Sequence, residues 1–232
     1  MTREIYHAKL EELESTTLDL GRLVATTIVQ AAEAMAAHDT EKSEEIIARD
    51  RQVNLERLQL ERAGLLLIAT QHPVAGDMRT LAALQEMVGE IERMGDYAKG
   101  IASITLKMDV GEPIPPVQQR LLVAMAEKAR EMLRISLDAF EQRDTDMACA
   151  VIPMDDEVDD MFAQVYQNVV SAEISDSTDF QRANYVLWAA HNLERTADRV
   201  INMCESVVYV VTGELVHGRK MTERTARSSP HG

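Results

Sequence analysis

Residues 183–207 read ANYVLWAAHNLERTADRVINMCESV, and their apolar side chains recur every three or four positions. A single apolar stripe with this spacing is typical of an amphipathic helix that packs against other helices. Residues 10–35 and 81–98 carry stripes of the same kind. The periodicity therefore predicts an all-α protein. The apolar stripe of residues 183–207 consists of Ala183, Val186, Ala190, Leu193, Ala197, Val200, Cys204 and Val207.

The composition agrees with long helices. The 232 residues include only 10 glycines and 6 prolines, which disfavours a turn-rich β fold. Aromatic residues make up 4% and hydrophobic residues 46%, so helix-forming aliphatic residues supply the material for a core. We expect one large or two small helical domains.

Breaks in the periodicity predict the helix boundaries. Proline disfavours helix in the residue that precedes it, so a helix should end before Pro73, and 109–117 (DVGEPIPPV) is the strongest break. Further breaks fall at residues 38–40, 144–145, 175–178 and 213. We expect six long helices in two pseudo-repeated antiparallel three-helix bundles. The expected divisions are a first repeat at 1–108, a Pro-rich linker at 109–117, a second repeat at 118–213 and a flexible tail at 214–232.

The two halves share motifs at nearly constant offsets. Asp39-Thr40 matches Asp144-Thr145 at an offset of 105 residues, the difference between 144 and 39. Glu92-Arg93-x-x-Asp96 matches Glu194-Arg195-x-x-Asp198 at an offset of 102, the difference between 194 and 92. This pattern predicts a duplicated three-helix unit. Pro153 departs from the repeat, and because proline lacks a backbone donor the fifth helix should kink or begin near it.

Charge and cysteine usage exclude several classes of protein. The 24 Lys and Arg against 39 Asp and Glu give a net charge of −15, opposite in sign to the charge that nucleic-acid binding requires. An acidic chain instead attracts cations or basic partner surfaces, and it also gains solubility. The two cysteines form no C-x-x-C pattern, which argues against a disulfide framework or a thiolate zinc site. We find no signal-peptide pattern or membrane-spanning run and expect a cytoplasmic protein.

The E-R-x-x-D motif places two carboxylates four residues apart, where they are neighbours on one helix face. Like charges at this spacing destabilise a helix by about 0.2–0.5 kcal/mol, so their repetition asks for an explanation. Oxygen ligands paired on adjacent helices are suited to hard cations such as Mg²⁺, Mn²⁺ or iron. The candidate metal ligands form four pairs, which are Asp50 with Asn54, Glu92 with Asp96, Asp155 with Asp159, and Glu194 with Asp198.

Two other interpretations stay open. The acids could form surface salt bridges with Arg93 and Arg195 or contact a basic partner, which would make the chain a metal-free helical interaction scaffold. The chain could also be a carboxylate-bridged di-metal helical-bundle enzyme, a class that uses E-x-x-H motifs. His191-x-x-Glu194 has the two residues of that motif in the opposite order. The matching position of the first half is Gly89, so the pair is not repeated. No P-loop, dinucleotide fingerprint or nucleophile elbow is present.

Five segments resemble the PhoU family of accessory regulators of phosphate-specific transport. Because E-R-x-x-D occurs twice in a duplicated chain, the resemblance is more specific than a single motif would be, and it extends over about residues 5–213. The segments are D-x-x-V-N (50–54), QHPVAGDMR (71–79), EIERMGDYA (90–98), D-x-x-x-D (155–159) and NLERTADRVINMCE (192–205).

The resemblance implies a cytoplasmic, often dimeric protein that is not an enzyme. It implies negative regulation of the phosphate-starvation response, between the ATPase subunit of a phosphate ABC importer and a sensor histidine kinase. Contact with the membrane would occur only through these partners. Some similar proteins hold metal clusters through E/D-x-x-x-D motifs, so the eight candidate residues would bind Fe, Mn, Mg or Zn. Asn54 departs from the acidic pattern and puts the first-half site in doubt relative to the second.

Overall fold

The computed structural model describes residues 3–71, 73–108, 114–172, 177–218 and 221, and the regular structure within them is entirely helical. This confirms the predicted all-α class. The helices are α1 (Arg3–Ala37), α2 (Thr40–Gln71), α3 (Ala75–Thr105), α4 (Pro116–Gln142), α5 (Thr145–Cys149), α6 (Ile152–Val170) and α7 (Ser177–Thr212).

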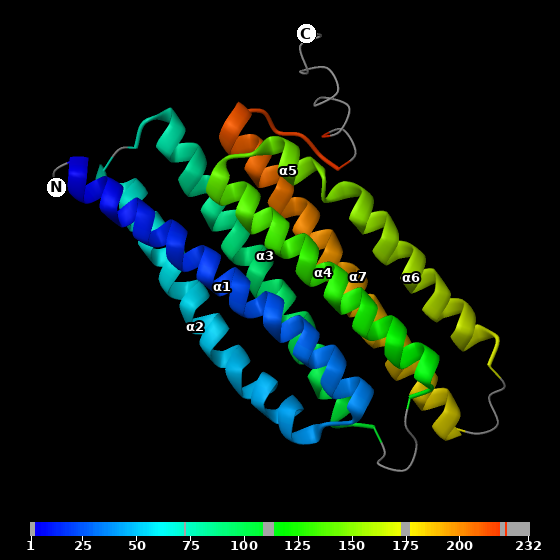
Figure 1. Ribbon diagram of the computed structural model, residues 1–232. Helices are drawn as coiled ribbons and strands as arrows, with labels where there is room; N and C mark the ends of the chain where they lie inside the picture. Colours follow the sequence, from blue (N-terminus) through cyan, green and yellow to red (C-terminus); the bar gives the residue numbers. More distant parts are fainter. Residues whose placement is uncertain (1–2, 72, 109–113, 173–176, 219–220, 222–232) are drawn as a thin grey trace, which may run out of the picture.

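The helices form two bundles that lie against each other (Figure 1). Helices α1, α2 and α3 make the first bundle, and α4, α6 and α7 make the second. Between the bundles α1 packs on α4 and α3 packs on α7. Buried side chains from both halves, among them Ile28, Ile91, Met132 and Leu193, belong to one continuous core. The duplicated halves are therefore joined by a shared hydrophobic interior.

The repeat extends to the backbone of the first turn in each half. His38 and Arg143, which are 105 residues apart, both adopt left-handed conformations, with φ of 53° and 57°. The following aspartate caps the next helix in each case. Asp39 accepts a hydrogen bond from the backbone N–H of Lys42 at 2.9 Å, and Asp144 accepts from those of Asp146 and Met147 at 2.9 and 3.0 Å.

The fifth expected helix is divided in two. Helix α5 has five residues and ends at Cys149, and α6 begins at Ile152 with Pro153 in its first turn. Proline is tolerated there because the first helical N–H groups have no partner within the helix. The expected effect of Pro153 is confirmed. One long helix of the second half is thereby replaced by a five-residue helix and a 19-residue helix.

Only parts of the expected linker and tail belong to the described residues. Residues 109–113 of the linker lie outside them, and Pro116 already begins α4. After α7 ends, the chain contacts that helix again at Glu205. Nδ1 of His217 lies 2.9 Å from the Glu205 carboxylate, and the N–H of Gly218 donates a hydrogen bond to it at 2.6 Å. Met221 is buried. The start of the segment expected to be a flexible tail is thus held against α7, and residues 219–220 and 222–232 lie outside the described part.

Candidate functional site

The two E-R-x-x-D motifs lie on α3 and α7, the helices that join the halves. Their acidic side chains point away from the α3–α7 contact, toward α2 in the first half and toward α6 in the second. Their arginines make their closest contacts elsewhere. Arg93 contacts Glu90 at 2.8 Å, and the guanidinium of Arg195 lies 4.6 Å from the centre of the Tyr97 ring. Among the described residues neither arginine forms a salt bridge with an acid of its own motif, although the charge of Arg93 still acts to lower the pKa of Glu92.

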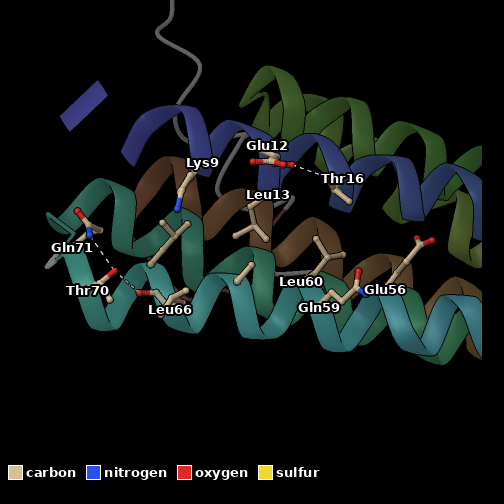
Figure 2. A pocket seen from close by; sticks show the side chains of 12 residues that line it. Lys9, Glu12, Leu13, Thr16, Glu56, Gln59, Leu60, Leu66, Thr70 and Gln71 are labelled. Carbon is tan, nitrogen blue, oxygen red and sulfur yellow. Dashed lines mark hydrogen bonds between the residues drawn. The ribbon is translucent and has the colours of Figure 1, made fainter. Parts of the chain in front are cut away.

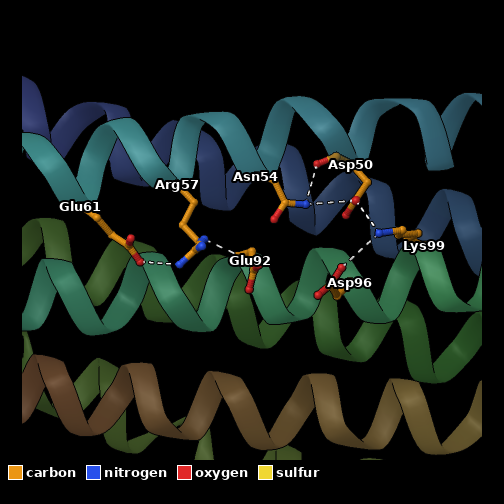
Figure 3. Close-up of polar contacts among 7 residues, drawn as sticks. All are labelled: Asp50, Asn54, Arg57, Glu61, Glu92, Asp96 and Lys99. Atoms are coloured by element: carbon orange, nitrogen blue, oxygen red, sulfur yellow. Dashed lines mark hydrogen bonds and ion pairs between the residues drawn. The ribbon is translucent and has the colours of Figure 1, made fainter.

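The first carboxylate cluster consists of Asp50, Asn54, Glu92 and Asp96, between α2 and α3 (Figure 3). Lys99 reaches into it, with Nζ 2.7 Å from Oδ2 of Asp50 and 3.5 Å from Oδ1 of Asp96. Asn54 donates a hydrogen bond to Oδ2 of Asp50 at 3.1 Å. The Asp50 side chain is only 6% exposed, so its charge depends on these contacts.

Glu92 is paired with a different cation, the guanidinium of Arg57. Nε of Arg57 lies 3.6 Å from Glu92, and the same guanidinium contacts Glu61 at 2.6 Å (Figure 3). Burial and then the nearby Asp96 raise the pKa of Glu92, while Arg57 opposes that shift. The structure thus brings together all four predicted residues of the first half, but lysine and arginine side chains already provide the positive charge.

The second carboxylate cluster consists of Asp155 and Asp159 on α6 with Glu194 and Asp198 on α7. Burial and then the charges of Asp159 and Asp198 raise the pKa of Asp155 to about 6. Burial and then Asp198 raise the pKa of Glu194 as well, against the opposing effect of His191, whose Nδ1 lies 3.1 Å from Oε2 of Glu194. The acids of α6 and α7 are thus near enough for their charges to act on one another.

The repeat explains why the two clusters differ. At the 105-residue offset, the position of Arg57 is taken by Phe162, and at the 102-residue offset the position of Lys99 is taken by Ile201. The second half also has Asp159 in place of Asn54. It therefore carries one more carboxylate than the first half and lacks both of the cations that serve the first.

The second cluster has the donors that a hard cation requires, since carboxylate oxygens are preferred by Mg²⁺, Mn²⁺ and similar ions. A bound cation would offset the repulsion that raises the pKa of Asp155. Within the described ranges, no three His, Cys, Asp or Glu side chains are yet gathered as a ligand set. To bind a cation, the acidic side chains on α6 and α7 would therefore have to rotate toward one another.

Lys99 and Arg57 contact the first carboxylate cluster but are not part of the acidic motifs that predicted it. A signal was available, because Lys99 lies three residues after Asp96 and Arg57 lies three after Asn54, both on faces shared with predicted ligands. The cross-helix reach of each side chain depends on how α2 and α3 are aligned.

A separate apolar groove of about 520 Å³ runs between α1 and α2 (Figure 2). Leu13, Leu60 and Leu66 line it, and its polar rim includes Lys9 and Glu56. It contains none of the eight predicted ligands. None of the helices in the described part of the chain combines the length and apolar character needed to cross a membrane.

Comparisons with known proteins agree with this architecture. The PhoU domain model matches twice, at residues 17–105 and 122–207, which corresponds to the two halves. A phosphate-specific transport system accessory protein PhoU homolog from Clostridium acetobutylicum is 32% identical over 93% of this chain and 98% of its own length. The Escherichia coli K12 accessory protein PhoU is 28% identical, over 90% of this chain and 86% of its own.

Solved structures show the same fold. The crystal structure of the phosphate transport system regulatory protein PhoU from Streptococcus pneumoniae superimposes with a TM-score of 0.83 at 29% identity, covering 91% of this chain and 99% of that one. The crystal structure of PhoU from Pseudomonas aeruginosa gives 0.82 at 27% identity, covering 90% and 100%. The resemblance inferred from the motifs and the expected bundle architecture are both confirmed.

Proposed function

The chain belongs to the PhoU family, and we propose that it is a regulatory accessory protein of a phosphate-specific transport system. In this proposal it acts in the cytoplasm as a negative regulator of the phosphate-starvation response. Its partners are the ATPase subunit of a phosphate ABC importer and a sensor histidine kinase. Support comes from similarity, over 90% or more of this chain, to relatives that are named as accessory proteins of this system.

Deletion of the gene tests the regulatory role. With phosphate in excess, a phosphate-starvation reporter should rise in the deletion strain and return to its low level when the intact chain is restored. The kinase and the importer ATPase should each be recovered with the chain after cross-linking in cells. An unchanged reporter would contradict the proposal, and capture of the ATPase without the kinase would remove the kinase from it.

We also propose that the second carboxylate cluster binds a metal ion and that the first does not bind one by itself. The observation that carries this is the replacement of Arg57 and Lys99 by Phe162 and Ile201 between the halves. Asp155, Asp159, Glu194 and Asp198 would supply the oxygen ligands. Fe, Mn, Mg and Zn are the candidate ions, and the ion would supply positive charge at a site of mutual carboxylate repulsion.

A matched pair of double variants tests the metal proposal. Metal content is measured by mass spectrometry on untagged protein purified without chelator. Glu194→Gln with Asp198→Asn should lose the metal, and Glu92→Gln with Asp96→Asn should retain it, with helicity equal in both. The same amount of metal in the second-cluster variant as in the unmodified chain would overturn the assignment.

The metal experiment also separates the competing interpretations. If partner capture is unaffected by chelator and no metal is found, the chain is a metal-free interaction scaffold. Oxygen consumption by iron-loaded protein would favour the di-metal enzyme. That class uses E-x-x-H motifs on two helices, whereas Gly89 occupies the position that matches His191. We therefore propose a non-enzymatic role.

We include a homodimer in the proposal, with α2 as the contact. Leu55, Leu58, Leu65 and Leu66 are each more than half exposed and, by helical spacing, fall on one face. A two-fold contact uses the same patch on both copies, and a leucine face can pack against itself. Leu58→Glu should convert a dimer to a monomer in light scattering, and Leu215→Glu, at another exposed leucine, should not. A monomeric unmodified chain would contradict the dimer.

A further inference from the structure

The contact between α3 and α7 carries a group of arginines outside the two carboxylate clusters. The helices run antiparallel, so that Arg93 and Tyr97 on α3 lie opposite Arg199 and Arg195 on α7. Residues four apart share a helix face, so these four side chains occupy one patch. We call the patch, together with Glu90, the arginine seam.

Glu90 is the single acid at the centre of the seam. Its side chain is 7% exposed, and its two oxygens lie 2.8 Å from an Nη atom of Arg93 and 3.5 Å from one of Arg199. The buried Nε of Arg199 has no hydrogen-bond partner among the described residues. Arg199 is thus paired with Glu90 through one Nη atom, and its Nε–H group can still donate a hydrogen bond.

The duplication leaves the other side of the seam without an equivalent acid. At the 102-residue offset, Arg93 corresponds to Arg195, but Glu90 corresponds to the neutral Asn192. Arg195 forms no ion pair with any residue in the described ranges, and its contact there is with the face of Tyr97. Glu90 thus pairs with two guanidinium groups, those of Arg93 and Arg199, and the patch as a whole holds three arginines against one acid, a local excess of positive charge in a chain whose net charge is −15.

We propose that the arginine seam binds inorganic phosphate, with Arg195 and Arg199 as its ligands. A guanidinium presents a planar fork of N–H donors that matches phosphate oxygens in a bidentate manner. Stacking on Tyr97 orients the Arg195 fork while leaving its edge N–H groups available. The anion would lie between Arg195 and Arg199, which are one helical turn apart on α7.

The neighbouring acids set the strength of this site. Glu86, one turn before Glu90, accepts a hydrogen bond from Ser206 at 3.0 Å, and Asp96 is paired with Lys99. Asp198, which belongs to the second carboxylate cluster, lies three residues after Arg195 and repels an anion. A cation in that cluster would reduce the repulsion, so metal should strengthen phosphate binding, although the seam itself does not require metal.

Equilibrium dialysis with radiolabelled inorganic phosphate tests the proposal on the full-length chain. The experiment is done in buffer with chelator, so that its result is independent of the metal proposal, and is repeated with Mn²⁺. We expect saturable binding that weakens about 10- to 100-fold in Arg195→Gln, the loss corresponding to one charge-assisted contact. Arg62→Gln removes the same charge from an exposed position on α2 and should leave the affinity unchanged.

Several outcomes would overturn the proposal. These are no saturable binding, equal affinity in Arg195→Gln and the unmodified chain, or equal weakening in Arg62→Gln. Binding of ATP without binding of inorganic phosphate would also overturn it, because the phosphoryl group would then belong to a nucleotide. Arg199→Gln is a second variant, and its helicity is checked first because Arg199 also supports Glu90. Weaker phosphate binding with unchanged helicity is expected there.

Discussion

The carboxyl group of Asp155 links the second carboxylate cluster to pH-dependent stability. Its pKa is raised from 3.8 to about 6 when the chain folds, first by burial and then by Asp159. The folded chain thus binds this proton more tightly than the unfolded chain. The resulting stabilisation is fully present below pH 3.8 and is lost as the pH rises through about 6.

Asp155→Asn should remove that dependence. Relative to the unmodified chain, the variant should gain about 1 kcal/mol in free energy of unfolding between about pH 4 and about pH 7.5, a value reduced for partial solvent screening. Urea unfolding at the two pH values measures the difference. Asp160→Asn, at an exposed position on the same helix, is the control. A gain of equal size in both variants would show that general charge reduction, and not the cluster, is responsible.

Lys99 permits a second prediction at the scale of residues. Its hydrogen bond to Asp50 is the main cause of its raised pKa, and Asp50 is 6% exposed. Lys99→Met should therefore leave a buried carboxylate without its cation and lower the free energy of unfolding by about 1–2 kcal/mol, because Lys99 itself is partly exposed. In an Asp50→Asn background the same change should cost less. A double-mutant cycle in urea measures the difference, and strict additivity would contradict the coupling.

At the scale of helices, the contact between α1 and α4 depends on Gly21. A Cβ at this position would lie 2.8 Å from Cδ2 of Leu137, whereas a Cβ at Gly89 of α3 meets nothing within 4 Å. Gly89→Ala should stabilise the chain by about 0.5–1 kcal/mol, since alanine favours helix over glycine. Gly21→Ala should gain less or lose stability because Leu137 must move. Thermal unfolding of the two variants compares them, and an equal gain would contradict the close contact.

The helices themselves could be predicted well from the sequence. Single apolar stripes and the breaks at 38–40, 71–73 and 144–145 fix their existence and their ends, because periodicity and capping are local properties. Pro153 also had its expected local effect. The candidate site was less predictable. The four acidic pairs are visible in the sequence, but the cations Arg57 and Lys99 reach them across the α2–α3 contact, which local patterns do not encode.

For the whole molecule, duplication was visible in the sequence but the relation between the halves was not. Matching offsets predicted two similar units, and the two PhoU-domain matches agree with them. The way in which α3 and α7 align depends on complementary surfaces from distant parts of the chain. That alignment turns Arg93 and Arg195 toward the seam and leaves their neighbouring acids to separate clusters.

The shared core predicts that the two halves unfold together. Ile91 of α3 is fully buried where both bundles contribute to the interior. Ile91→Ala should lower the free energy of unfolding by about 2–4 kcal/mol, through lost burial and the cavity that remains.

If the core is one cooperative unit, hydrogen exchange of the most protected amides should accelerate in α7 of the second half as much as in α2 of the first. Ile5→Ala, at a half-exposed position near the start of α1, is the control and should change neither. Acceleration confined to α1–α3 would mean that the bundles open separately. The α3–α7 contact would then be a hinge between two units, and the arginine seam would lie at that hinge.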